Sequence, residues 1–211
     1  MIVRMSDLID RAMTQTEDDV NREQFVAERE KAAAEMIESG YDRRYEKLFN
    51  DVAGYVALYR MNKVKTGYML MGTVGCGKTE AALRIAAMLN VPFYTTGQLL
   101  DIFGTPEYYS AIKSINFFTD KPSTMVIDEL GTEPRPFLHF GNRYNVMADV
   151  LRERYDYFKL YGAKTIITTN LTFEELENAY GNRVESRCWE MFKVKQYSGD
   201  DYRRKDNQSI A

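Results

Sequence analysis

The hydrophobic and polar positions follow two successive patterns along the chain. From residue 66 onward, short apolar runs alternate with stretches of helical periodicity. Runs that are apolar on both faces are typical of strands in a parallel sheet with crossover helices. The predicted strands are 67–71, 91–96, 124–128, 164–169 and 192–197, and the predicted helices are 79–90, 97–103, 108–117, 143–160 and 173–187. These elements predict a three-layer α/β fold, with a parallel five-stranded sheet flanked by helices.

The preceding residues have a purely helical pattern. The segment before Gly40 is rich in good helix formers, and its apolar side chains recur at roughly helical intervals: Phe25, Val26, Ala33, Met36 and Ile37. It predicts one or two helices that end near Gly40. A second helix is expected over 41–61, with one apolar face formed by Tyr45, Leu48, Phe49, Val52, Val56 and Tyr59. We therefore expect a helical N-terminal extension, residues 1–62, that offers a possible partner-binding region, followed by an α/β domain, residues 63–211.

The amino-acid composition excludes several classes of protein and of catalytic site. The chain has 45% hydrophobic and 28% charged residues, as ordinary soluble proteins do, and no apolar stretch long enough for a membrane helix, so we expect a cytoplasmic protein without membrane contact. Its single histidine, His139, and its two cysteines, Cys76 and Cys188, argue against a His-dependent triad and against a disulfide framework. The net charge is −3, so nucleic-acid contacts would need a local basic patch.

The strongest motif follows the first predicted strand and opens the next helix. It reads Gly72-Thr73-Val74-Gly75-Cys76-Gly77-Lys78-Thr79 and fits the phosphate-binding pattern G-x-x-x-x-G-K-[ST]. Glycines let backbone N–H groups turn toward phosphate oxygens, and the helix adds the positive end of its dipole. Lys78 would reach the β- and γ-phosphates, and the hydroxyl of Thr79 would ligate Mg²⁺. Glu80, in the first helical turn, completes the expected nucleotide-binding set, while Cys76 occupies an unconstrained position and is expected to pack.

Two further predicted strands end in polar residues. Asp128 is placed to hold Mg²⁺ through its waters, and Glu129, pointing the other way, can polarise an attacking water, although two adjacent acids also occur in solvated turns. Asn170 follows the fourth strand. If that strand lies beside the first, its amide would reach the γ-phosphate or the water; alternatively, Asn170 caps the next helix.

Two arginines lie near the end of the chain. Arg183 and Arg187 are four residues apart and would share one helical face, with Val184, Cys188 and Met191 facing elsewhere. An arginine that reaches the phosphates of a neighbouring subunit can raise hydrolysis by orders of magnitude. Alternatively, the two arginines form ion pairs with Glu185 or Glu190 on the protein surface.

The motifs GTVGCGKT, MVIDE, ITTN and GNRVESR occur in an order that resembles the AAA+ ATPases of the bacterial helicase-loader group, the DnaC/DnaI type, and the related transposition ATPase IstB. The resemblance spans about residues 66–205 and ends, as that group does, without a full C-terminal lid domain. It implies an ASCE sheet with the phosphate-loop strand beside the Asn170 strand, and ATP and Mg²⁺ as ligands. It also implies head-to-tail assembly into an open ring or spiral, in which Arg187 is the arginine finger and Arg183 its companion.

The function that this resemblance implies is ATP hydrolysis coupled to loading or remodelling a replicative DNA helicase, with assembly on single-stranded DNA. Two alternatives stay open: a transposition helper that binds a transposase, and a nucleotide-gated DNA-binding adaptor with little hydrolysis. A small-molecule kinase fits the adjacent acids and the arginine motif less well.

Two segments remain outside these motifs. A candidate nucleic-acid surface combines aromatic rings with lysines, namely Tyr108, Tyr109, Lys113, Phe117, Phe118 and Lys121, although the rings could equally be core. The insertion 131–142, rich in proline and aromatic residues, matches no motif of the family. His139 lies within it and is expected to be structural or exposed.

Overall fold

The computed structural model describes residues 5–41, 45–116 and 119–198, with side chains described from residue 21 onward. The chain divides into two compact units, Met1–Val64 and Lys65–Ala211. None of the helices in the described ranges combines the length and apolarity that crossing a bilayer requires.

The first unit pairs two helices, α1 (Met5–Glu38) and α2 (Glu46–Arg60). A bidentate ion pair joins them, in which Arg60 donates to the two Glu35 carboxylate oxygens at 3.0 and 2.6 Å and lowers the pKa of that carboxyl. On α1, Met36 is buried, but Val26 and Ile37 are 47% and 45% exposed. The predicted helices are confirmed, and only some of the apolar residues that recur along α1 are buried.

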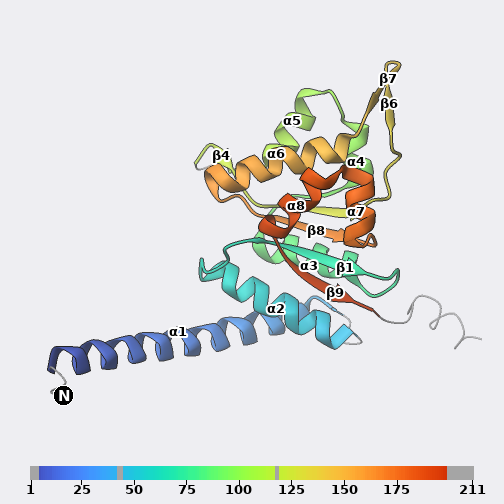
Figure 1. The fold of residues 1–211 in the computed structure, drawn as a ribbon. Helices are drawn as coiled ribbons and strands as arrows, with labels where there is room; N and C mark the ends of the chain where they lie inside the picture. Colours follow the sequence, from blue (N-terminus) through green and yellow to red (C-terminus); the bar gives the residue numbers. More distant parts are fainter. Residues whose placement is uncertain (1–4, 42–44, 117–118, 199–211) are drawn as a thin grey trace, which may run out of the picture. The chain divides into compact units, whose positions relative to one another are not determined.

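The second unit is built on a five-stranded parallel sheet (Figure 1). Its strands are β1 (Gly67–Gly72), β2 (Phe93–Thr95), β5 (Met125–Leu130), β8 (Thr165–Thr169) and β9 (Phe192–Tyr197). They lie in the order β2-β5-β8-β1-β9. All five predicted strands are confirmed, as is the expectation that the first lies beside the fourth.

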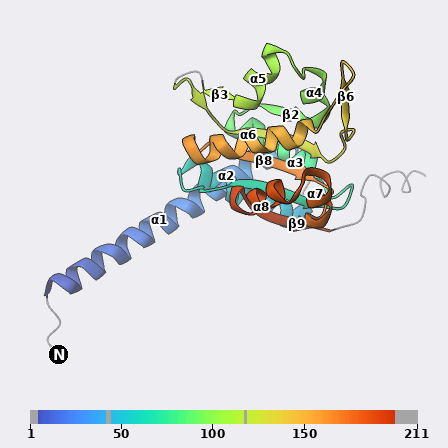
Figure 2. The ribbon, with the colours of Figure 1, turned by 45° about the horizontal axis from the view of Figure 1, so that its top comes forward.

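Helices cover both faces of this sheet (Figures 1 and 2). They are α3 (Lys78–Leu89), α4 (Thr96–Asp101), α5 (Pro106–Lys113), α6 (Val146–Tyr161), α7 (Phe173–Tyr180) and α8 (Asn182–Met191). The core on one face joins Met69, Ile127 and Ile167 to residues of α6, α7 and α8. Because side chains alternate along a strand, their neighbours Tyr68, Val126 and Ile166 face the opposite side, where α3 contacts β5 and β8. The three-layer arrangement predicted from the sequence is therefore confirmed.

Two details differ from the sequence-based prediction. The segment 173–187 forms two helices, because Gly181, with φ of 89°, ends α7 before α8 begins. Two short hairpins were not predicted: β3 (Ile115–Asn116) with β4 (Lys121–Pro122), and β6 (Phe137–His139) with β7 (Asn142–Tyr144). The second hairpin begins within the unassigned 131–142 insertion and ends two residues after it.

Arg154 of α6 is a fully buried cation that ties several elements together. Its guanidinium donates to the carbonyls of Ile112 at 3.0 Å, Ser123 at 2.8 Å and Lys164 at 2.6 Å, and to the Thr165 hydroxyl at 2.9 Å. Burial lowers the pKa of Arg154 to about 10, which still leaves it charged at neutral pH. One side chain thus satisfies backbone acceptors at the end of α5, before β5 and at the start of β8.

We predict that Arg154→Met lowers the free energy of unfolding by about 3–5 kcal/mol, because it leaves several buried carbonyls without donors. Arg154→Lys should retain part of the stability, since an ammonium can reach fewer of these acceptors. Urea unfolding followed by circular dichroism measures both. The matched control is Arg152→Met on the same helix, where the side chain is 52% exposed and the change should stay within about 0.5 kcal/mol. Equal effects at the two positions would contradict the assignment.

Candidate nucleotide-binding site

The glycine-rich loop begins where β1 ends and closes on the first residue of α3. Gly72 has φ of 147°, and a Cβ there would meet the Tyr197 carbonyl oxygen at 1.8 Å. The next amide, that of Thr73, donates to the same oxygen at 3.3 Å. Gly77, with φ of 87°, then turns the chain into the helix. The start of the loop therefore needs glycine because it runs against the end of β9.

Lys78 lies inside this loop. Its side chain is buried, and its ammonium donates to the carbonyl oxygens of Gly72 at 2.9 Å and Thr73 at 2.7 Å, with the Cys76 sulfur at 3.5 Å. The N-cap residue of α3, Gly77, provides no side-chain hydrogen bond to the first turn. A cation and the positive end of a helix dipole thus meet in one loop, which suits an anion such as phosphate.

The remaining loop residues surround this cation. Gly75 and Cys76 are buried, Thr79 and Glu80 are half-buried, and Val74 is 55% exposed. Glu80 forms an ion pair with Arg84 one turn along α3, at 2.7 Å. The packing expected for Cys76 agrees with its burial. The Thr79 hydroxyl, at the end of the glycine-rich loop, is an oxygen ligand of the kind that Mg²⁺ takes.

Asp128 is buried at the carboxyl end of β5, where the Thr168 hydroxyl donates a hydrogen bond to its carboxylate. The same hydroxyl accepts a hydrogen bond from the Glu129 backbone N–H at 2.9 Å. Asp128 and Thr168 lie two residues after Val126 and Ile166 on their strands. By alternation they belong to the face of the sheet that α3 covers. The sequence analysis did not predict Thr168 as a functional residue. Its position in the ITTN motif is the feature of the sequence that could have indicated it.

Glu129 departs from the strand pattern. Ile127 pairs with Ile167, but Leu130 already pairs with Thr169, so Asp128 and Glu129 oppose the single residue Thr168. This is a β-bulge, and Glu129 has the left-handed φ of 63°. The strict alternation expected for the two acids is therefore wrong at Glu129.

Such a backbone conformation is strained by about 1–3 kcal/mol for a residue other than glycine. The Glu129 carbonyl is held by the Thr132 N–H at 3.1 Å and hydroxyl at 2.9 Å, and by the Thr96 hydroxyl at 3.3 Å. Its side chain is exposed. The surrounding hydrogen bonds hold a solvent-accessible carboxylate at a fixed, strained position, as active sites commonly do.

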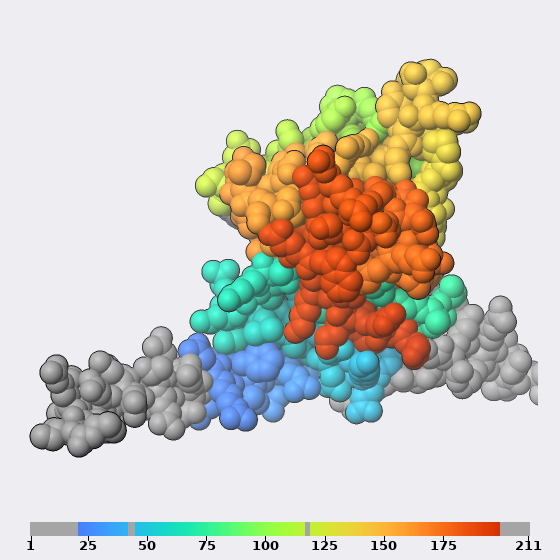
Figure 3. Space-filling view, in the orientation of Figure 1, coloured from blue at the N-terminus to red at the C-terminus, as the bar shows by residue number. Residues whose placement is uncertain are grey.

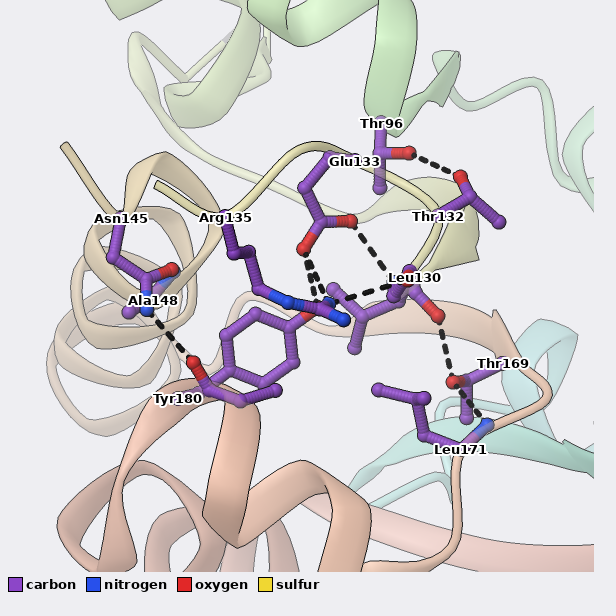
Figure 4. Close-up of polar contacts among 12 residues, drawn as sticks. Thr96, Leu130, Thr132, Glu133, Arg135, Asn145, Ala148, Thr169, Leu171 and Tyr180 are labelled. Carbon is purple, nitrogen blue, oxygen red and sulfur yellow. Dashed lines mark hydrogen bonds and ion pairs between the residues drawn. The ribbon is translucent and has the colours of Figure 1, made fainter. Parts of the chain in front are cut away.

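Asn170 follows β8 and is exposed. The cap of α7 is Thr172, whose hydroxyl accepts from the Glu175 N–H at 3.2 Å in a complete capping box. The alternative that Asn170 caps this helix is therefore wrong. Its neighbour Thr169 donates to the Leu130 carbonyl at 2.7 Å and so fixes the end of β8 against β5 (Figure 4).

The strand register brings these ends to one edge of the sheet. Met71, the residue before the loop, pairs with Thr169, and Thr169 pairs with Leu130. The ends of β1, β5 and β8 are thus adjacent, with Gly72, Asp128 and Asn170 at the carboxyl edge where parallel sheets bind ligands. Buried Asp128 and the half-buried Thr79 have the oxygen chemistry of a magnesium site that keeps several waters.

The two arginines lie on α8. Val184, Cys188 and Met191 face inward, as expected, and burial raises the pKa of the Cys188 thiol to about 12. Arg183 is exposed, and the half-buried Arg187 guanidinium lies 4.5 Å from the centre of the Tyr155 ring on α6.

The pairing alternative for these arginines does not match the observed contacts of the two carboxylates. Glu185 accepts from the Trp189 indole N–H at 2.5 Å, and Glu190 accepts from the Tyr155 hydroxyl at 2.7 Å and from Lys159. Both carboxylates therefore have other donors.

A buried carboxylate anchors the 131–142 insertion near the same edge. Glu133 accepts from the Tyr180 hydroxyl at 2.6 Å, the Arg135 guanidinium at 3.1 Å and the Gly131 N–H at 2.9 Å (Figure 4). Burial, followed by the Glu133 charge and hydrogen bond, raises the pKa of Tyr180 well above its usual range. This cluster links the segment after β5 to the end of α7. The sequence analysis missed it because Tyr180 is 45 or more residues from Arg135 and Glu133.

Only part of the nucleic-acid surface that was predicted from the sequence is exposed to solvent. Tyr108 is buried against Phe103, and burial raises the pKa of Tyr108 above its usual range, so the prediction that it stacks on bases is wrong. Tyr109 is 52% exposed, and Lys113 is exposed. Phe117 and Phe118 lie outside the described residues.

The fold is similar to those of several solved structures. A proposed primosome component from Streptococcus pyogenes serotype M3 is 20% identical with a TM-score of 0.53, over 76% of this chain and 82% of that one. DnaI is 20% identical with a TM-score of 0.52, over 71% and 82% of the two chains. AMPPCP-bound DnaA from Aquifex aeolicus is 15% identical with a TM-score of 0.53, over 81% of this chain and 52% of that one.

No protein-family model matches the chain, and no curated protein matches it. The structural likeness establishes the fold, a parallel α/β sheet flanked by helices, and this fold agrees with the one that the motif resemblance to DnaC/DnaI proteins implied.

We predict that Thr168→Val, which keeps the side-chain volume but removes the hydroxyl, lowers the free energy of unfolding by about 1–3 kcal/mol. Asp128 then loses its buried donor, and the Glu129 N–H loses its acceptor. Thr168→Ser, which keeps the hydroxyl, is the matched control and should lose less. Urea unfolding measures the difference; a valine variant more stable than the serine variant would show that the hydroxyl does not hold the bulge.

Proposed function

We propose that this protein is a Mg²⁺-dependent ATPase of the AAA+ type that loads or remodels a replicative DNA helicase. The observation that carries the proposal is the convergence of the phosphate-type loop, buried Asp128 and strained Glu129 at adjacent strand ends of one sheet. The fold likeness to DnaI and to AMPPCP-bound DnaA supports the choice of an adenine nucleotide and of a replication protein.

Lys78 would bind the β- and γ-phosphates of ATP. Its ammonium already lies in the loop, where it donates to two neutral carbonyls. Phosphate oxygens are charged acceptors and form stronger hydrogen bonds than carbonyls do, so bound ATP can compete for this cation. The uncapped first turn of α3 and loop residues 72–80 would hold the remaining phosphate charge.

Thr79 and Asp128 would hold Mg²⁺, Thr79 directly and Asp128 through water. When bound, the ion would offset the negative charge that develops on the phosphate oxygens. The Thr168 hydroxyl fixes the Asp128 carboxylate for this role. Because that hydroxyl also holds the Glu129 N–H, the two acids are oriented by one residue.

Glu129 would act as the base. Its carboxylate takes a proton from a water molecule whose oxygen attacks the γ-phosphorus, the bond to the β-phosphate oxygen breaks, and ADP and inorganic phosphate are released. The bulge holds this carboxylate exposed near the end of β5, which β8 separates from the loop strand β1. Asn170, at the end of the intervening strand, would position the water or contact the γ-phosphate.

Arg187 would act on the ATP of the next subunit, with Arg183 beside it. In the single chain, Arg187 stacks on Tyr155 through a cation–π contact, which leaves its N–H groups less tightly held than an ion pair would. A site that is completed from a neighbour explains why the arginines lie on α8. Head-to-tail contacts of this kind generate rings or spirals.

The N-terminal unit would bind the helicase, and assembly would take place on single-stranded DNA. Support for the helicase is the fold likeness to a proposed primosome component and to DnaI. Pull-down of the full chain with a replicative helicase and, separately, with a transposase distinguishes the loader from a transposition helper. Capture of the transposase alone would overturn the loader assignment.

We predict that Glu129→Gln and Arg187→Ala each lower ATP hydrolysis at least about 100-fold, because one removes the base and the other the neighbour's cation. An equal mixture should recover about a quarter of the wild-type rate, since a head-to-tail contact is competent only when an Arg187→Ala site meets a Glu129→Gln neighbour. Phosphate release at a fixed total concentration, with single-stranded DNA present, measures all three samples.

Arg152→Ala, an exposed arginine outside the proposed site, is the control and should keep the wild-type rate. A mixture as inactive as its components, although both variants assemble, would show that the sites are not shared. ATP binding without phosphate release by assembled wild-type protein would favour the nucleotide-gated adaptor instead.

A further inference from the structure

The hairpin β6–β7 has one packed face and one exposed face. Phe137, His139 and Tyr144 pack around the Phe103 ring, with centroid distances of 5.7, 5.2 and 5.0 Å. Leu138 is 66% exposed and Phe140 is 92% exposed, and Arg143, which pairs with Leu138 across the hairpin, is exposed as well. In Figure 3 the hairpin projects from the surface at the upper right. We refer to Leu138, Phe140 and Arg143 as the hairpin tip.

The backbone holds Phe140 in an unfavourable conformation. Phe140 and Gly141 are the two turn residues and have φ of 46° and 78°. Such turns favour Asn-Gly or Gly-Gly, and a bulky residue with positive φ costs on the order of 1 kcal/mol. The Phe140 ring meets the His139 ring edge-on at a centroid distance of 4.4 Å, but it remains 92% exposed. A phenylalanine that is strained and so largely exposed adds little to the packing of this chain, which points to a role outside it.

The hairpin is firmly anchored. At its base, Arg135 is held by Glu133 and by the Tyr180 hydroxyl at 3.2 Å, and Glu133 is buried (Figure 4). At its packed face, Phe103 also contacts Tyr108 edge-on at 5.2 Å. The tip is therefore presented on a rigid support rather than on a loose loop.

The charge around the tip favours a polyanion. Residues 134–148 contain Arg135 and Arg143 and no aspartate or glutamate. The hairpin lies at the same end of this unit as α5, which carries the exposed Tyr109 and Lys113 (Figures 1 and 3). Glu107, in the first turn of α5, is the acid on that helix. Aromatic side chains interspersed with cations are the pattern of surfaces that bind single-stranded nucleic acid in any sequence.

The size of the tip also favours a nucleotide over a protein. Three side chains are far fewer than the roughly 20–30 residues a side of a stable protein interface. They match one nucleotide, because an aromatic ring stacks on a single base and a guanidinium binds a single phosphate. Weak contacts of this kind become strong when subunits repeat them along a strand.

We propose that the hairpin tip is a single-stranded nucleic-acid contact, in which Phe140 stacks on a base, Leu138 packs against the sugar and Arg143 binds a phosphate. The inference rests on the proposed assembly on single-stranded DNA and adds to it a site outside the nucleotide-binding edge. The contact is independent of base sequence, because every base has a π-face.

Fluorescence anisotropy of fluorescein-labelled oligothymidine with the full chain, in the presence of Mg²⁺ and ATP, tests this contact. Phe140→Ala should weaken binding about 5- to 150-fold, the equivalent of one lost stacked base. Arg143→Gln should weaken binding and flatten its salt dependence by about one phosphate contact. The matched control is Leu160→Ala, which truncates a 72% exposed residue near the C-terminal end of α6.

Phe140→Trp provides a direct readout of stacking. It should keep wild-type affinity, and the fluorescence of the introduced indole should be quenched by oligothymidine. Unchanged affinity of Phe140→Ala, or an indole whose emission does not respond to the oligonucleotide, would overturn the proposal. So would loss of helicase capture by Phe140→Ala with DNA binding intact, since the tip would then bind protein.

The proposal of a hairpin contact can be tested separately from the proposal of an ATPase. Hydrolysis without DNA should be equal in wild-type protein and in Phe140→Ala, because the tip is not part of the nucleotide-binding edge. If wild-type protein hydrolyses ATP but binds oligothymidine no better than Phe140→Ala does, the hairpin inference fails and the ATPase stands. If no ATP is hydrolysed but Phe140→Ala still loses DNA, the ATPase fails and the hairpin contact stands.

Discussion

A single hydroxyl group, that of Thr168 on the central strand β8, holds the candidate site in its shape. It donates to the Asp128 carboxylate and accepts from the Glu129 N–H, so that two residues of β5 face one residue of β8. Without this acceptor the Glu129 N–H would be unpaired in a partly buried position, and the positive φ of Glu129 would be held by the hydrogen bonds to its carbonyl alone. The different environments of the two acids, one buried and one exposed, follow from this arrangement.

The same edge of the sheet is connected to more distant parts of the unit. The Glu129 carbonyl is held by Thr96 and Thr132, and the next residue, Glu133, binds the Tyr180 hydroxyl at the end of α7. Gly181 then leads directly into α8, which carries the arginines. A displacement of the bulge on nucleotide binding therefore has a short, hydrogen-bonded route to the hairpin and to α8. Buried polar clusters of this kind transmit position because breaking one bond leaves a costly unpaired group.

Two strained residues mark the functional hypotheses. Glu129 and Phe140 both have a left-handed backbone, and both side chains are exposed. Neither conformation is favoured by the residue itself, so each must be maintained by its surroundings: hydrogen bonds at Glu129, and the packing of Phe137, His139 and Tyr144 on Phe103 at the hairpin. Strain that persists in this way is most economically explained by what the side chain does outside the packed core.

Local chemistry made part of this structure predictable from the residues alone. The five strands, most helices and the loop from Gly72 to Thr79 were predicted because period, glycine spacing and capping act over a few neighbouring positions. The place of Asn170 beside the loop strand came from the family resemblance together with the rule that ligands bind at carboxyl ends of parallel strands. What lay beyond such reasoning depends on pairs distant in sequence. The bulge at Glu129 needs Thr168, and the hairpin of residues 137–144 needs Glu133 to meet Tyr180. These contacts exist only after β5, β8 and α7 have packed, because the free energy that favours them comes from excluding water from groups that the chain brings together on folding.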